Sequence, residues 1–155
     1  MIFVYNARLL NASNMIGGYM EYEFIRDPDL DVVGKGFQVE FSHEHRIVGR
    51  WLMEEFGTDL DELQKVFDFM SEIEAAKITE QFVLGKEISL KLNRYEALIE
   101  ANALHQQEHD LSIYEDDALE LDENGLSAGC GFEDFLDMLE AWRDFVIDNN
   151  RKRRR

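Results

Sequence analysis

The chain has 155 residues, the length of one domain, and its 45% hydrophobic and 32% charged residues are the mixture of a globular protein. Its single cysteine, Cys130, excludes an internal disulfide, and no apolar run approaches the ~20 residues that a membrane-spanning helix needs. The formal net charge is −17, from 16 basic and 33 acidic residues. We therefore expect a soluble, cytoplasmic protein.

The charge is distributed unevenly along the chain. Residues 1–19 contain one basic residue and no acid, and residues 151–155 are all basic. The region 20–150 therefore keeps 10 basic residues against all 33 acids, a net charge of −23. Such a surface repels nucleic acid and anionic membranes, because both are bound through Lys and Arg. A basic protein surface is the partner that this charge favours.

The first nineteen residues also lack a clear hydrophobic period. We expect 1–19 to be a non-native N-terminal extension, with Met20 as the native start. A single α+β domain is then expected over 20–150, followed by a basic tail at 151–155. The intact mass of the protein expressed from its own gene tests this prediction. A mass that corresponds to a chain beginning at Met20 would support it, and one that corresponds to a start at Met1 would contradict it.

From Met20 onward, apolar residues alternate with polar ones, which is the pattern of half-buried strands. Tyr22 and Phe24 mark one strand, and the segment 37–42 marks a second. Ile47, Gly49 and Trp51 lie two residues apart and predict a third strand. Together these segments predict a three-stranded antiparallel meander.

The hydrophobic period then changes. Apolar spacing predicts a helix at about 58–77, with Thr58 near its start, and alternation at 88–92 predicts a strand. Segment 95–103 is ambiguous: its Glu, Ala and Leu content favours a helix, and its alternation favours the second strand of a hairpin. A final helix is predicted at about 132–148. The expected fold is α+β, with an antiparallel sheet of about five strands and two helices packed on one face.

Four segments, at 20–27, 45–56, 87–104 and 130–146, together resemble the YacL-type family of small uncharacterised bacterial proteins. The resemblance covers residues from about 20 to 147. It implies that the native chain begins at Met20 and that 95–103 is the second strand of a hairpin. The family has no assigned activity, so the resemblance implies no functional residue.

The most acidic segment is 108–123, which contains eight acids and no Lys or Arg. We expect an exposed loop there, and a binding surface for a cationic partner. The residues predicted to bind that partner are Glu115, Asp116, Asp117, Glu120 and Asp122.

Other short motifs carry weaker signals. His105 to His109 matches the H-x-x-E-H zinc pattern, but it lies where a strand gives way to the acidic segment, so exposed histidines are the simpler interpretation. His43 and His45 would share a face of a strand, but no further ligand is placed beside them. Segment 120–131 has Gly131 where a calcium loop needs a bidentate Glu. The sequence thus indicates no catalytic residue, metal or cofactor.

The leading interpretation is a non-enzymatic acidic binding or regulatory protein that acts on a cationic partner. One alternative is a small enzyme with a cleft site between sheet and helices. Another is a homodimeric module whose acidity serves solubility alone.

Overall fold

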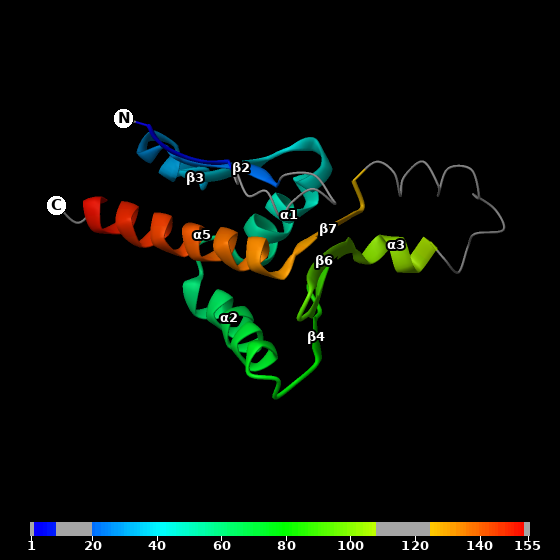
Figure 1. The fold of residues 1–155 in the computed structure, drawn as a ribbon. Helices are drawn as coiled ribbons and strands as arrows, with labels where there is room; N and C mark the ends of the chain where they lie inside the picture. The colour runs from blue at the N-terminus through cyan, green and yellow to red at the C-terminus, as the bar shows by residue number, and fades with distance from the viewer. Residues whose placement is uncertain (1, 9–19, 108–124, 154–155) are drawn as a thin grey trace.

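The computed structural model describes residues 2–8, 20–107 and 125–153. These residues form two antiparallel sheets, of three and four strands, and several helices, so the predicted α+β class is confirmed (Figure 1). The prediction of one sheet of about five strands is wrong. Strand pairing, which local patterns do not encode, divides the strands between the two sheets.

The first sheet contains three strands in the order β1-β2-β3. Its second and third strands coincide with the first two strands that the alternating pattern predicts. Its first strand comes from the segment expected to be an extension, and whether that segment is native stays a prediction. Tyr22 and Phe24 face the core and stack with their ring centroids 5.1 Å apart. The bounds are β1 Phe3–Arg8, β2 Glu21–Arg26 and β3 Phe37–Phe41.

The third predicted strand is also wrong, because this segment is helical. Helix α1 (Arg46–Trp51) follows a short 3₁₀ turn, η3 (His43–His45), and continues as a π-helical turn, η4 (Leu52–Phe56). The large apolar side chains that are buried in α1 and at the start of η4 fall at i, i+1, i+4 and i+5, which is the spacing of one helix face. These residues are Ile47, Val48, Trp51 and Leu52, and Gly49 of α1 is buried as well.

The second sheet contains four strands in the order β4-β5-β6-β7. The β5–β6 hairpin confirms both the strand predicted at 88–92 and the strand that the resemblance implied at 95–103. Asn93 shapes its turn, since its Oδ1 accepts hydrogen bonds from the backbone N–H groups of Tyr95 and Glu96 at 2.8 and 2.9 Å. The bounds are β4 Glu80–Val83, β5 Ile88–Asn93, β6 Glu96–Ala101 and β7 Ser127–Gly131.

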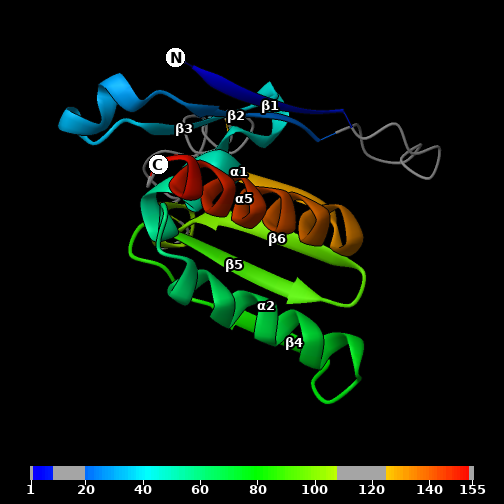
Figure 2. The same cartoon turned by 90° about the vertical axis from the view of Figure 1, so that its left-hand side faces the viewer.

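The two predicted long helices are present, and a short helix, α3 (Asn102–Gln107), follows β6. Helix α2 (Leu60–Glu74) is capped by Asp59, which accepts the backbone N–H of Glu62 at 3.2 Å. Helix α5 (Phe132–Arg153) extends beyond the predicted end. Figures 1 and 2 show α2 and α5 on the same side of the four-stranded sheet, with α5 also lying against the three-stranded sheet. The two helices therefore share one face of a sheet, as predicted, although that sheet is not the single sheet that was expected.

The core sits where α5 meets both sheets. Trp142 of α5 is fully buried, with its ring edge-on to Phe24 at 5.0 Å and to Phe37 at 6.1 Å. None of the helices in the described part of the chain combines the length and apolar composition needed to cross a bilayer.

Candidate functional site

A surface groove lies between β3 and α1. Gly49 allows the helix to come close to the strand, because a Cβ there would lie 2.7 Å from Cδ1 of Phe41. The groove has a volume of about 620 Å³, within the size range of ligand and peptide sites. It is lined by Val39, Glu40, Phe41, Arg46, Gly49, Arg50, Met53 and Glu54.

The groove combines an apolar floor with a charge-balanced rim. The floor is formed by the half-buried side chains of Val39, Phe41 and Met53. Two arginines and two glutamates line the same space, and Arg50 Nε lies 3.2 Å from Glu54 Oε2. In a chain of net charge −17, a surface without excess acid is distinctive.

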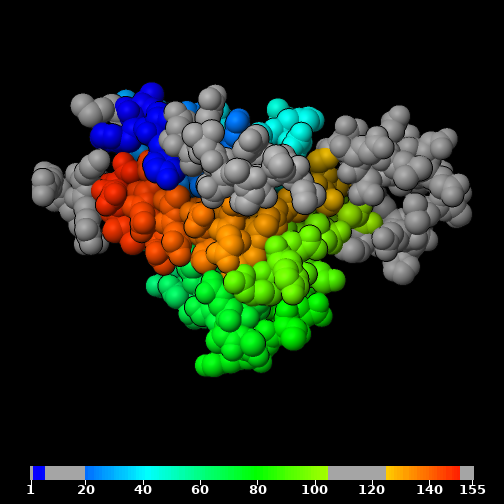
Figure 3. All heavy atoms as spheres, viewed as in Figure 1, coloured from blue at the N-terminus to red at the C-terminus, as the bar shows by residue number. Residues whose placement is uncertain are grey.

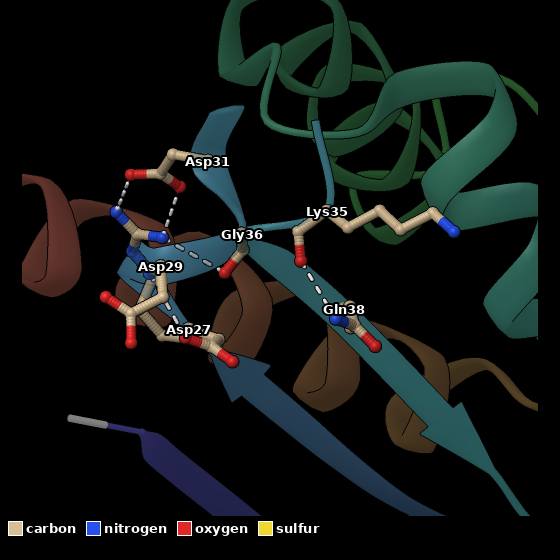
Figure 4. Close-up of polar contacts among 7 residues, drawn as sticks. Asp27, Asp29, Asp31, Lys35, Gly36 and Gln38 are labelled. Carbon is tan, nitrogen blue, oxygen red and sulfur yellow. Dashed lines mark hydrogen bonds and ion pairs between the residues drawn. The ribbon is translucent and has the colours of Figure 1, made fainter. Parts of the chain in front are cut away.

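A second structured element is the connection between β2 and β3, drawn in Figure 4. It contains a 3₁₀ helix, η2 (Pro28–Val33), and is held by Arg26, which is only 2% exposed. The Arg26 guanidinium donates to both carboxylate oxygens of Asp31, at 2.6 and 2.9 Å, and to the carbonyl oxygen of Gly36 at 3.1 Å. The guanidinium carbon also lies over the ring of Phe37, 4.5 Å from its centroid.

The same connection requires glycine at two positions. Gly34 has φ +74°, a left-handed conformation that ends the 3₁₀ helix. A Cβ on Gly36 would collide with Asp31 and approach Arg26 Nη1 to 2.6 Å. The connection is therefore tightly specified, yet its tip exposes Val32 by 94% and Val33 by 64%.

Glu55 fixes the connection between β4 and β5. Its carboxylate accepts backbone N–H groups of Lys86, Glu87 and Ile88, at 2.8, 3.1 and 3.2 Å. Three donors converging on one carboxylate form an anion-binding concavity, which this side chain occupies. A smaller cavity of about 170 Å³ adjoins it, with Trp51 and Phe56 in its wall.

Helix α5 carries a row of exposed acids, which we call the α5 acid row. Its members recur every three or four residues and so lie on one side of the helix, opposite the buried residues that face the core. Figure 3 shows α5 as a continuous orange-to-red band across one face of the molecule. The row consists of Glu133, Asp137, Glu140, Asp144 and Asp148.

Burial raises the pKa values of three titratable groups near this helix. Desolvation raises the pKa of the Cys130 thiol to about 12, with smaller contributions from Asp134 and Glu96. Desolvation likewise raises the pKa of Tyr22, with the charges of neighbouring groups adding to it. The carboxyl pKa of Asp134 is raised by desolvation first and then by neighbouring acids. The thiol is thus protonated at neutral pH, as befits a packing residue.

His43 and His45, which would share a face if they lay on a strand, are separated by the fold. The two residues lie in a 3₁₀ turn, where His43 is exposed and His45 is buried. His45 Nε2 lies 3.1 Å from the carbonyl oxygen of Gly129 and donates to it, joining the turn to the edge of the second sheet. Within the residues that the structure describes, no three His, Cys, Asp or Glu side chains are grouped as metal ligands would be.

The predicted partner-binding residues Glu115, Asp116, Asp117, Glu120 and Asp122 lie outside the described residues, and so does His109 of the zinc-like motif. Their role stays a prediction. The α5 acid row was missed, although its spacing is readable in the sequence. The groove had no comparable signal, because it depends on the packing of α1 against β3.

Comparison with known proteins identifies the family. Residues 20–146 match the Uncharacterised protein family (UPF0231). The chain belongs to this family. The match confirms the resemblance to the YacL-type proteins.

Relatives within the UPF0231 family are similar over nearly their whole length. A UPF0231 protein of Vibrio cholerae serotype O1 is 34% identical over 137 residues, which are 85% of this chain and 99% of the relative. A UPF0231 protein of Shewanella oneidensis is 37% identical over 128 residues, covering 82% and 97% of the two chains. No solved structure matches the chain.

Proposed function

We propose that this UPF0231 protein is a non-enzymatic binding or regulatory protein whose acidic surface docks onto a cationic partner. The observation that carries the proposal is the α5 acid row. It spans positions 133 to 148, a length of about 22 Å at the rise of an α-helix. A row of this length on a rigid helix presents its charges in a fixed pattern.

Few basic groups of the described structure neutralise the row. Arg94 Nη1 lies 3.1 Å from Glu133 Oε1, and both side chains are exposed, so the pair is weak. Arg143 lies with its guanidinium carbon 4.7 Å from the ring centroid of Phe67 and its Nε 3.7 Å from Asp144. The five acids of the row therefore outnumber the described basic groups that lie beside them, and such an excess of negative charge accelerates association with a basic surface.

The acids of segment 108–123 belong to the same proposal. Glu115, Asp116, Asp117, Glu120 and Asp122 precede α5 in the chain and add to the total negative charge. They extend the set of carboxylates that a basic partner can meet. Their contribution is separable from that of the α5 acid row by substitution.

Affinity purification from a bacterium that carries the protein tests the proposal. We expect a basic protein to be retained at moderate salt by the wild type. A variant with Asp137→Asn, Glu140→Gln and Asp144→Asn should lose it, because the centre of the row is neutralised.

Two further variants of equal charge change locate the interaction. Asp68→Asn with Glu72→Gln and Glu74→Gln neutralises exposed acids of α2 and should leave retention unchanged. The third variant combines Glu115→Gln, Asp116→Asn and Asp117→Asn. It measures how much of the retention depends on the acids of segment 108–123. Equal retention by all four proteins, or retention of acidic proteins alone, would refute the proposal.

A further inference from the structure

Strand β3 lies at an edge of its sheet, because the strand order is β1-β2-β3. Two hydrogen bonds fix which backbone groups of β3 point outward: Asp27 N–H to the Gly36 carbonyl and Ser42 N–H to the Glu21 carbonyl. Bonded pairs in an antiparallel ladder recur every second residue, so Gln38 and Glu40 bond to β2. The backbone N–H and C=O groups of Phe37, Val39 and Phe41 therefore point away from the sheet.

We propose that this edge pairs with β3 of a second copy of the chain, forming a two-fold symmetric dimer with a continuous six-stranded sheet. Antiparallel pairing centred on Val39 uses all three outward-pointing residues. Phe37 of each copy then lies opposite Phe41 of the other, and Val39 lies opposite itself. Such an isologous contact closes on itself and leaves no further edge at β3.

The charges of this region suit a second copy of an acidic protein. The groove beside β3 is lined by two arginines and two glutamates, whereas the α5 acid row is uniformly negative. In the centred register Glu40 lies opposite Gln38, so no like charges meet across the ladder. The half-buried Val39, Phe41 and Met53 would lose their remaining contact with water.

The mass of the full chain in solution, measured by sedimentation over a range of concentrations, tests the proposal. We expect twice the monomer mass of 18.2 kDa at high concentration. Val39→Pro removes an N–H that points away from β2, which an edge strand tolerates. It should weaken dimerisation by at least about tenfold, since two symmetric hydrogen bonds are lost.

Charge substitutions provide a matched comparison. Arg50→Glu reverses a charge in the groove and breaks the exposed pair with Glu54. Lys65→Glu makes the same change on α2 and breaks the exposed pair with Glu62. We expect the first to weaken the dimer and the second to leave it unchanged. Equal effects of the two substitutions would contradict a β3 interface.

Cross-linking tests the register directly. Residues that exchange both backbone hydrogen bonds lie about 5.5 Å apart at Cα, a distance that a disulfide can span. Val39→Cys should therefore yield a covalent dimer under mild oxidation, whereas Gln64→Cys on the exposed side of α2 should not. A monomeric wild type at every concentration, a dimer that survives Val39→Pro, or no cross-link through Val39→Cys would overturn the proposal.

Discussion

The indole N–H of Trp142 donates to the carbonyl oxygen of Gly57 at 3.0 Å. This bond joins the middle of α5 to the end of the π-helical turn, two parts of the chain that are 85 residues apart. The same ring packs edge-on against Phe24 of β2. Trp142 thus ties the first sheet, α5 and the α1–η4 segment into one core.

Replacing Trp142 with Phe should destabilise the fold more than the same replacement at Trp51. Both indoles are buried. Of these two described side chains, the one whose indole N–H donates a hydrogen bond is Trp142. The Gly57 carbonyl would lose its partner, at a cost of about 1–3 kcal/mol beyond the loss of volume. Urea unfolding of the two variants measures the difference, and equal losses would show that the hydrogen bond contributes nothing.

Removing the partner of buried Arg26 should be among the most damaging changes outside the apolar core. Asp31→Ala leaves a guanidinium that is 2% exposed without its carboxylate, which costs about 3 kcal/mol for a buried pair. Lys65→Ala breaks an exposed ion pair and should change the free energy of unfolding by less than about 0.5 kcal/mol. Similar values for the two variants, from thermal or urea unfolding, would contradict the structural role of Arg26.

Glu54 and Glu55 are adjacent but should respond differently to the loss of charge. Glu55→Gln removes one acceptor oxygen from three converging N–H groups and should cost about 1–3 kcal/mol. Glu54→Gln affects only an exposed pair with Arg50 and should be close to neutral. Hydrogen exchange at the amides of Lys86 to Ile88 should accelerate in the first variant alone.

Cys130 should react slowly with thiol reagents in the folded state. Its pKa is raised from 9.0 to about 12 by burial, so the reactive thiolate is scarce at mildly alkaline pH. Unfolding in urea should restore rapid labelling.

The same shift predicts how the free energy of unfolding depends on pH. Because the pKa of the Cys130 thiol is higher in the folded state than in the unfolded state, its contribution to stability is fully present below pH 9.0 and is lost as the pH rises toward 12. Wild type should therefore lose stability relative to Cys130→Ala in that range, and a constant difference would contradict the shift.

Strands with strict alternation could be predicted from sequence, because a period of two determines which side chains face the core. This holds for β2, β3 and β5. The α1 segment fails because Ile47, Gly49 and Trp51 fit a strand as well as a helix. Glycine costs about 1 kcal/mol inside a helix, which argues against the observed structure locally. Glycine is needed there because a Cβ would lie 2.7 Å from Cδ1 of Phe41, and this close approach of α1 to β3 is a tertiary feature that no local pattern reveals.

Strand β7 illustrates a second limit. Its sequence, SAGCG, has low strand propensity, and its position beside β6 determines its structure. The groove depends in the same way on how α1 meets β3. In contrast, the α5 acid row follows from the helical spacing of its acids, and could have been found from sequence alone.

Docking of a cationic partner on the α5 acid row is tested most directly by the dissociation constant of the retained partner, measured as a function of salt. For the wild type, affinity should fall steeply as salt rises from about 0.05 to 0.5 M, because exposed charges are screened over this range. The variant with Asp137→Asn, Glu140→Gln and Asp144→Asn should bind at least about tenfold more weakly at low salt, with a shallower dependence. Identical affinities and identical salt dependences for the two proteins would contradict the proposal.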